Sequence, residues 1–448
     1  MRDLVKAGLS FSWTMPLFGA QQLVYWLAPT AERRRQSAAG LDAVSRAAAG
    51  GLDQSSLGRL YQLGQCLQEG LVQLAPTLLT PELLYPSTWL ELSLEVAQRS
   101  LTAARQVAEG EALLALDEIR AKGEVFCLVL DVAKLIGVPT EPPFPLYELL
   151  ARAYALGPFR ALWAVEGLGK EYGDSFWNQG IVPHAILRDE RTSGLPAQSL
   201  TMLNAGIGLS FAVYCLDKTS WRTNEPALRG LVQEILRLCR DNAREGYLGA
   251  AYESLGLVTR TFHADLVPAV DAALRQSAPE VLGYYWHGVG RAIYFAIINF
   301  LPGSDGLIFR MARDEAPDGA AKLSSVAGAA WAYALVAQRD PRILAELVIE
   351  PYGEELAADD AFANGVASSM MMRFDTTPEA PFIPTFYQYQ PSPSNPRLVR
   401  LWEQLVRRPS ELALNVYYPV IKQHNRMGDI FEYRDLAAFV ARLQREAA

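Results

Sequence analysis

The chain has 448 residues, of which 50% are hydrophobic and 20% are charged, and its formal net charge at pH 7 is −8. This composition excludes a disordered chain, and the acidic balance argues against a nucleic-acid-binding surface. The four cysteines form no Cys-x-x-Cys pair and the four histidines are scattered. We therefore expect a cytoplasmic protein with reduced thiols and without a metal centre.

Residues 1–140 are predicted to form an amino-terminal helical region. Apolar residues recur with helical spacing over residues 55–79 and 91–134. The segment from Met1 to Leu27 carries two Trp residues and is interrupted by Pro16. We expect this segment to dock on the rest of the core, and peripheral membrane contact is the alternative. Because no stretch of eighteen uninterrupted apolar residues occurs, no transmembrane helix is predicted.

Residues 141–375 follow a proline-rich break and contain a short string of small residues that recurs six times. The strings are Glu166-Gly-Leu-Gly169, Ala205-Gly-Ile-Gly208, Glu253-Ser-Leu-Gly256, His287-Gly-Val-Gly290, Ser325-Val-Ala-Gly328 and Asn364-Gly-Val-Ala367. Successive strings end 34 to 48 residues apart, a spacing typical of helical-hairpin repeats. We therefore predict an all-α fold with about six helical hairpins and a period near 40 residues. Both an open solenoid and a closed bundle satisfy this pattern.

The glycines of these strings fall inside apolar stretches that we expect to be buried helices. Glycine in a helix interior costs about 1 kcal/mol relative to alanine, so its repeated placement needs a compensating gain. Several strings carry a second small residue four positions on, as at Gly208/Ala212 and Gly328/Ala332. Such a flat face lets a neighbouring helix approach closely. The alternative is that the small residues line the floor of a cavity.

The chain after residue 375 is predicted to complete the array. Residues 376–396 hold six prolines interleaved with aromatic residues, so we expect an extended segment that packs along the surface. Residues 397–448 are expected to form a carboxy-terminal helical cap, because a repeat stack must cover its last apolar face.

Four polar residues near the strings are candidates for chemistry. These catalytic candidates are Glu166, Glu253, His287 and Arg291. Paired carboxylates and a histidine could perform acid–base chemistry if the strings meet at the centre of the array. The alternative is that they form ordinary helix-surface pairs four residues apart, such as Glu166 with Lys170. Under that interpretation Arg260, two turns after Glu253, simply satisfies its charge.

Aromatic residues also gather around the strings, and most aromatic residues at helical spacing belong to a core. The alternative is an aromatic-walled pocket for a long hydrophobic ligand. The ligand-binding candidates are Trp163, Arg260, His263, Tyr285, Trp286, Tyr294, Trp331 and Tyr333. The sequence contains no phosphate-binding loop and no dinucleotide fingerprint, which argues against nucleotide-dependent chemistry and leaves any cofactor unknown.

The segment Gly288-Val-Gly290-Arg291-Ala-Ile-Tyr294-Phe295 resembles the Gly-x-Gly-Arg, small, aliphatic, aromatic, Phe signature of an uncharacterised family encoded in enediyne polyketide biosynthetic clusters. The resemblance covers roughly residues 158–336. It departs where the family has Phe-His after an acidic string, because Leu257-Val258 stands there, and where His287 replaces an amide. The resemblance implies a place in specialised metabolism and leaves the reaction open.

These observations favour an accessory protein of enediyne-like polyketide metabolism that binds or transforms a hydrophobic polyene or polyketide-like intermediate. A non-catalytic scaffold that binds a partner protein is the first alternative. A peripheral membrane module anchored through Met1 to Leu27 is the second. Whether the protein is an enzyme stays open at this point.

Overall fold

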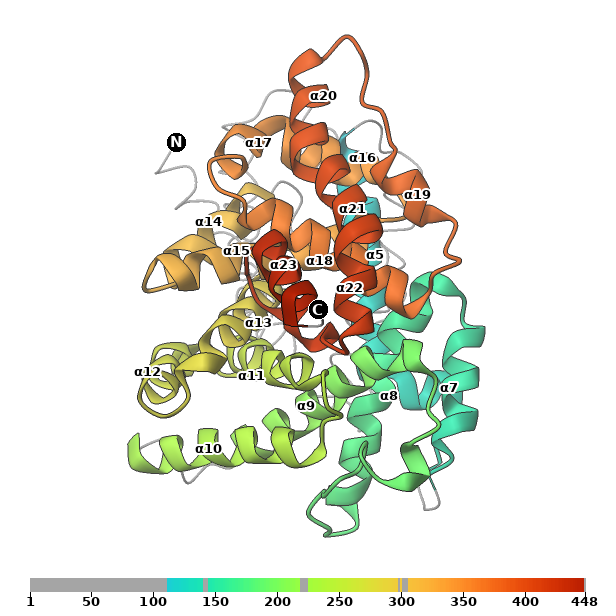
Figure 1. Cartoon of the computed structure of the whole chain (residues 1–448), viewed down its shortest axis with the longest axis vertical. Helices are drawn as coiled ribbons and strands as arrows, with labels where there is room; N and C mark the ends of the chain where they lie inside the picture. Colours follow the sequence, from blue (N-terminus) through green and yellow to red (C-terminus); the bar gives the residue numbers. More distant parts are fainter. Residues whose placement is uncertain (1–110, 140–143, 218–224, 297–298, 300–304, 447–448) are drawn as a thin grey trace, which may run out of the picture. The chain divides into compact units, whose positions relative to one another are not determined.

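The computed structural model describes residues 111–139, 144–217, 225–296, 299 and 305–446. They belong to one compact unit, Glu109–Ala448. Within these residues the regular secondary structure is helical throughout (Figure 1), which confirms the all-α prediction. The predictions for residues 1–110, including the helix at 55–79 and the segment from Met1 to Leu27, lie outside the described residues.

Long buried helices form the centre of this unit, and each packs against the next along the chain. They are α8 (Pro158–Asn178), α9 (Leu200–Leu216), α11 (Leu248–Phe262), α13 (Leu282–Tyr294), α15 (Gly319–Ala337) and α18 (Ala361–Thr376). The row curls until its ends meet. Arg373 on α18 donates hydrogen bonds to the carbonyl oxygens of Pro158, at 2.8 Å, and Phe159, at 3.3 Å. The bundle is therefore closed rather than an open solenoid.

Except for Gly167, the glycines of the repeated strings lie where two of these inner helices touch. A Cβ added at Gly206 would come closer than 3.0 Å to the carbonyl oxygen of Glu166 on α8. The same holds for Gly288 against the carbonyl of Glu253, and for Gly328 against that of His287. Because real Cβ atoms do not approach backbone so closely, only glycine permits these helix spacings. The close packing expected from the sequence is present.

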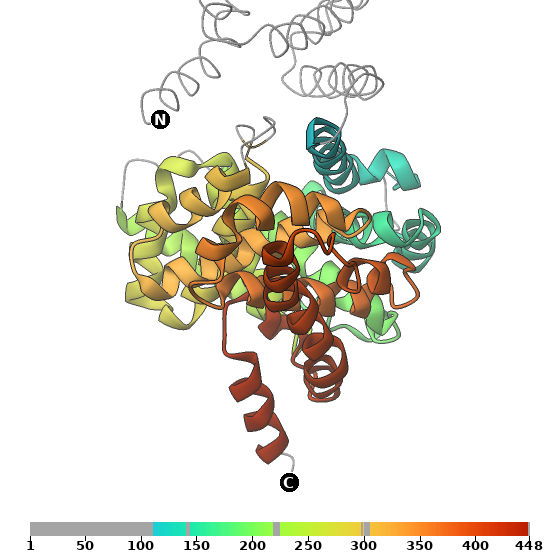
Figure 2. The same cartoon turned by 90° about the horizontal axis from the view of Figure 1, so that it is seen from above.

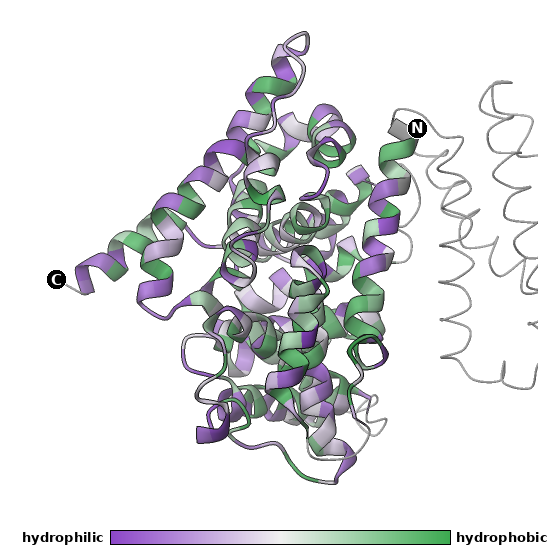
Figure 3. Cartoon of the chain, turned by 90° about the vertical axis from the view of Figure 1, so that its right-hand side faces the viewer, coloured by the Kyte–Doolittle hydropathy of each residue, from purple (hydrophilic) through white to green (hydrophobic). Residues whose placement is uncertain are grey.

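Outer helices cover the inner ones, and their polar sides face outward (Figure 3). They are α7 (Leu146–Ala155), α10 (Glu225–Asn242), α12 (Val267–Ser277), α14 (Asp305–Glu315), α16 (Pro341–Leu344) and α17 (Glu350–Leu356). Helix α5 (Glu111–Leu130), which α6 (Val132–Ile136) follows, packs across α8 and α15. Two helical stretches, Ala197–Leu216 and Gly319–Ala337, are apolar and long enough to cross a membrane, but 89% and 83% of each tested window is buried here. Core helices of globular units share that property.

The carboxy-terminal part runs across one side of the unit (Figure 2). Residues 376–396 were expected to be extended, but Phe382–Tyr387 within them forms the short helix α19. Residues 396–423 form a continuous helical run, in which α20 (Pro396–Trp402), α21 (Arg408–Leu412) and α22 (Tyr418–Gln423) are joined by π-helical segments. Pro409 and Pro419 each follow a π-helical segment, where the wider turn relieves the clash of the proline ring with the preceding carbonyl. Helix α23 (Leu436–Glu446) ends the described chain.

Candidate functional site

The four catalytic candidates meet inside the bundle. Arg291 on α13 donates from Nη2 to both carboxylate oxygens of Glu166 on α8, at 2.6 and 2.5 Å. Its Nη1 donates to Glu253 Oε2 on α11 at 3.2 Å. His287, one turn earlier on α13, places Nδ1 3.4 Å from Glu253 Oε1. We call Glu166, Glu253, His287 and Arg291 the central cluster.

The register of the inner helices explains why the central cluster is buried. The carbonyl oxygens of Glu166, Glu253 and His287 each lie against a glycine of the next inner helix. At such short helix spacing these residues face the interior, and all members of the cluster are at most 2% exposed. The surface-pair interpretation is therefore wrong, and Lys170 pairs instead with Asp174 at 2.6 Å.

Burial controls the charges of the central cluster. It raises the pKa of Glu166, the neighbouring Glu253 charge raises it further, and the Arg291 guanidinium opposes both effects. For Arg291, burial acts to lower the pKa, but the two carboxylates outweigh it and the net shift is upward. The guanidinium thus stays charged. Two ionised carboxylates and one guanidinium leave one excess negative charge, and the raised pKa of Glu166 favours the proton that would neutralise it.

Aromatic rings enclose the central cluster on two sides. The Arg291 guanidinium carbon lies 4.9 Å from the ring centre of Trp331 and 5.8 Å from that of Trp163, within the range of cation–π attraction. The ring of Phe431, from the segment that precedes α23, lies 5.7 Å from Trp331 and 6.2 Å from His287. Trp163 and Trp331 are therefore part of the packing around Arg291.

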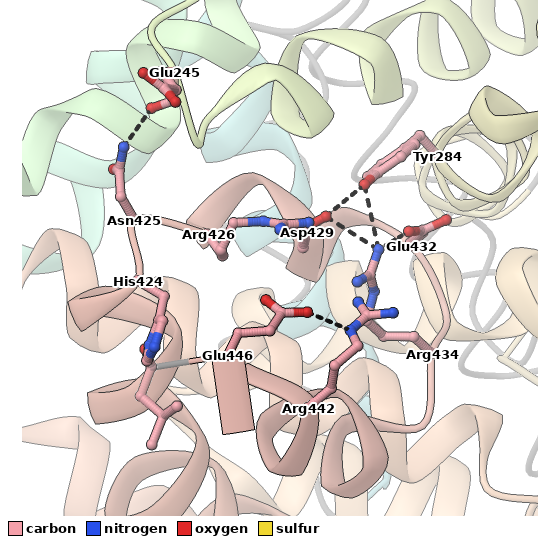
Figure 4. Close-up of polar contacts among 11 residues, drawn as sticks. Glu245, Tyr284, His424, Asn425, Arg426, Asp429, Glu432, Arg434, Arg442 and Glu446 are labelled. Atoms are coloured by element: carbon pink, nitrogen blue, oxygen red, sulfur yellow. Dashed lines mark hydrogen bonds and ion pairs between the residues drawn. The ribbon is translucent and has the colours of Figure 1, made fainter. Parts of the chain in front are cut away.

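The segment that carries Phe431 is fastened to α13 and to the turn before α11 by polar contacts (Figure 4). Asp429 accepts hydrogen bonds from Tyr284 Oη at 2.9 Å and Arg434 Nη2 at 3.1 Å, and it pairs with Arg426. Despite burial, these partners hold the pKa of Asp429 below its ordinary value. An ionised Asp429 thus fixes the segment, and with it Phe431, against the central cluster.

An apolar pocket of about 330 Å³ lies on another side of Arg291. Arg291 and Phe295 contribute to its wall, and the Phe295 ring packs edge-on against Trp163 at 6.2 Å. The apolar wall consists of Val125, Phe126, Val129 and Leu130 on α5, Leu209 and Val213 on α9, Leu257, Val258 and Phe262 on α11, and Phe295. No glycine of the repeated strings lines this pocket, so the expectation of a glycine-lined cavity floor does not apply to it.

Polar residues mark the remaining wall of the pocket. They are Lys170, Asp217, Thr261 and His263. His263 Nε2 lies 3.5 Å from Asp217 Oδ1, and Lys170 is held by Asp174. The side chains of Phe262, 59% exposed, and Leu130, 36% exposed, reach solvent, so the pocket opens between α5 and α11.

Several ligand-binding candidates lie away from this pocket. Tyr285 and Trp286 point to the outer helix α12, where Tyr285 Oη donates to the Val267 carbonyl and Trp286 Nε1 to Asp271. Arg260 forms a double hydrogen bond with Glu315 rather than with Glu253. None of the three predicted residues is a pocket residue. Tyr285 and Trp286 do lie on a helix face that packs against a neighbour, but this neighbour is the outer helix α12.

Tyr294 and Tyr333 belong to a second buried network. Tyr294 Oη donates to Glu118 Oε1 at 3.0 Å, and Glu118 pairs with Lys122 at 2.7 Å. Tyr333 Oη donates to Asp305 at 2.6 Å. Burial raises the pKa of Glu118, and Lys122 opposes that shift. Tyr294 thus anchors α5 to α13, Tyr333 anchors α14 to α15, and neither tyrosine lines the pocket.

Sequence reasoning missed most of the pocket. Only Arg291 and His263 among the candidates line it. The α5 wall was assigned to the amino-terminal region, and Glu118 and Lys122, four residues apart, look like a surface pair in the sequence. Phe295 was visible only as the end of the Gly-x-Gly-Arg segment. No local signal identifies the α5 residues, because their burial depends on packing against α8 and α15.

Comparison with known proteins gives no relative from which a role could be transferred. No family model, no curated protein and no solved structure matches the chain. The function must therefore be argued from the geometry of the pocket and the central cluster.

Proposed function

We propose that the protein binds a hydrophobic small molecule in the pocket between α5, α9, α11 and α13. The observation that carries this proposal is the pocket of about 330 Å³, with ten apolar side chains in its wall and one buried guanidinium. Small-molecule sites are mostly apolar, contain a few placed polar groups and span roughly 300 to 1,000 Å³. The pocket has each of these properties.

The ligand class that we propose is a polyene or polyketide-like intermediate of specialised metabolism. Its support is the resemblance of residues 288–295 to the enediyne-cluster family, together with the apolar wall. The resembling segment contains Arg291 and Phe295, which both line the pocket. Glu166 and Glu253 are positioning residues in this proposal, because they hold Arg291 and are not among the wall residues.

We also infer that the recurring strings mark about six helical-hairpin units with a period near 40 residues. The support is the use of glycine at successive contacts between inner helices, as at Gly206, Gly288 and Gly328. Under this proposal the pocket is a gap between the inner helices of neighbouring units, and α5 covers this gap.

The proposal is tested with the full chain and Nile red, a neutral apolar dye whose fluorescence rises in apolar surroundings. Val213→Trp should fill the pocket, because Val213 lies in its wall and is only partly buried. We expect dye affinity to fall at least about tenfold, the equivalent of 1.4 kcal/mol. Val416→Trp, at a position 44% exposed on the carboxy-terminal helical run, should bind as the wild type does.

Native mass spectrometry of the protein purified from its own host complements the dye measurement. A bound apolar small molecule that Val213→Trp fails to retain would identify the ligand class directly. Equal dye affinity for the wild type and Val213→Trp, with only a polypeptide co-purifying, would refute the proposal and favour a scaffold.

A further inference from the structure

We infer that the polar end of the ligand is electrically neutral, a carbonyl or hydroxyl oxygen rather than a carboxylate or phosphate. This inference rests on the proposed function and specifies the ligand of the same pocket. It follows from the charges around the pocket. Each cationic side chain there has a carboxylate partner, and Asp217 adds a negative charge, so both features disfavour an anion.

Arg291 forms the charged floor of the pocket, and its charge is already compensated. Arg291 is the cation there, and its guanidinium is held by Glu166 and Glu253 at 2.5 to 3.2 Å. With both carboxylates ionised, the trio of Glu166, Glu253 and Arg291 carries one negative charge; with Glu166 protonated it carries none. In neither state does it carry the positive charge that an anionic head group would need. A desolvated anion beside this floor would remain uncompensated, which is costly in a buried site.

The rest of the wall gives an anion no better partner. Lys170 is bound to Asp174 at 2.6 Å, so its charge is largely neutralised. Asp217 adds a negative charge beside His263. Among the described wall residues, each cationic side chain thus lies beside a carboxylate. When these partner carboxylates, Asp174, Glu166 and Glu253, are counted with the wall residues, the sum of the charges is negative.

A neutral oxygen does have a suitable partner. The buried Nε–H of Arg291 has no hydrogen-bond acceptor in the described part of the chain. A buried donor without an acceptor costs about 1–3 kcal/mol, so such a group calls for a partner. Because Nε is enclosed in this structure, a small rotation of the Arg291 side chain would present its N–H to the pocket. A carbonyl or hydroxyl oxygen there would then accept this hydrogen bond without adding a charge, while the tail of the ligand contacts the apolar wall.

The test compares head groups on one tail. The full chain at pH 8, well above the ordinary histidine pKa of about 6.5, is titrated with 2-dodecanone, 1-dodecanol and dodecanoate in competition with Nile red. We expect the ketone and the alcohol to bind at least about tenfold more tightly than dodecanoate. Dodecanoate that binds as tightly as the ketone, or more tightly, would overturn the inference.

A charge variant makes the test specific to the floor. In Glu166→Gln/Glu253→Gln the charge of Arg291 loses both partners, so dodecanoate should gain at least about tenfold in affinity relative to the ketone. Glu379→Gln, on the surface, should leave the preference unchanged. If the double variant does not fold, Glu253→Gln alone should shift the preference in the same direction. An unchanged preference in the folded variant contradicts the inference.

The two proposals fail in distinguishable ways. If none of the three probes displaces Nile red, the pocket does not bind apolar ligands, and the proposed function fails together with the inference. If all three probes bind and dodecanoate is preferred, the proposed function stands and only the neutral head group is wrong.

Discussion

Arg291 is the residue on which the interior of this protein depends. It is 2% exposed, and it joins α13 to α8 and α11 through two carboxylates. A buried ion pair of this kind adds little net stability, since desolvation offsets most of the attraction, but removal of one partner leaves an uncompensated charge. The central cluster therefore specifies how three helices fit together.

Replacement of the guanidinium alone should destabilise the protein strongly. Arg291→Met leaves Glu166 and Glu253 buried without a cation, so we expect the free energy of unfolding to fall by about 3–5 kcal/mol. Urea unfolding followed by circular dichroism measures this loss. Glu166→Gln/Glu253→Gln/Arg291→Met, which removes all three charges, should recover much of it. A single variant as stable as the wild type would contradict the role of Arg291.

The raised pKa of Glu166 predicts a pH-dependent stability. Because the pKa of Glu166 in the folded protein is above the ordinary value of 4.5, the folded protein binds more protons than the unfolded chain once the pH rises past 4.5. The stability that Glu166 contributes therefore falls as pH rises from 4.5 through the folded pKa. Glu166→Gln lacks this dependence. We expect the free energy lost in Glu166→Gln, measured by urea unfolding, to shrink across this window.

Other groups titrate in the same range, so the pH experiment compares two chains at each pH. Glu118, whose pKa is also raised, contributes equally to the wild type and the variant and cancels in their difference. Glu379→Gln, at an exposed position, should show a constant difference from the wild type. A constant difference for Glu166→Gln as well would mean that Glu166 is ionised to the same extent in both states.

At the scale of the helix, glycine placement sets the distances between neighbours. Gly290 on α13 faces the carbonyl oxygen of Ser325 on α15, and Gly328 on α15 faces His287 on α13. The two contacts are reciprocal, so the helices are held together at both points. The cost of glycine in a helix is offset by the dense packing that follows.

A matched pair of glycine substitutions tests this interpretation. In Gly290→Ala the new Cβ would come closer than 3.0 Å to the backbone of α15, so we expect a loss of about 1–3 kcal/mol from overpacking. Gly230 on α10 is exposed, and a methyl group added there would meet no atom within 4 Å. Gly230→Ala should therefore stabilise the helix by about 0.5–1 kcal/mol. Thermal unfolding compares the two, and equal signs would refute the packing argument.

At the scale of the molecule, the central cluster is bordered by two different features, the pocket and the carboxy-terminal segment that carries Phe431. The pocket lies beside Arg291 under α5, whereas Phe431 covers His287 and Trp331 from the carboxy-terminal segment. Arg373 joins α18 to α8 and completes the bundle. The described residues therefore supply their own core and every wall residue named for the pocket.

This self-sufficiency predicts that residues 109–448 fold without the first 108. The compact unit Glu109–Ala448 has its own hydrophobic core, which is the physical requirement for independent folding. We expect the truncated chain to show a helical spectrum, one cooperative thermal transition and Nile red affinity within about threefold of the full chain, a difference below 1 kcal/mol. A non-cooperative transition would show that residues 1–108 are needed for the fold.

By itself, the sequence determined the helical class and the positions of close helix contact, and it named the residues of the central cluster as candidates. These features are local, because apolar spacing and glycine placement act within a few turns of one helix. The strings placed Glu166, Glu253 and His287 at related positions, and that register brought them together. The number and period of the repeats remain a prediction.

Only the tertiary structure decided which side chains meet and where the pocket lies. Glu166 and Arg291 are 125 residues apart, and no spacing within a helix encodes their contact. Trp286 and His287 are adjacent, yet one points to α12 and the other to the interior. The burial of α5 likewise depends on helices that follow it in the chain. The physical reason is that packing of several helices, rather than the pattern on one, determines which faces are enclosed.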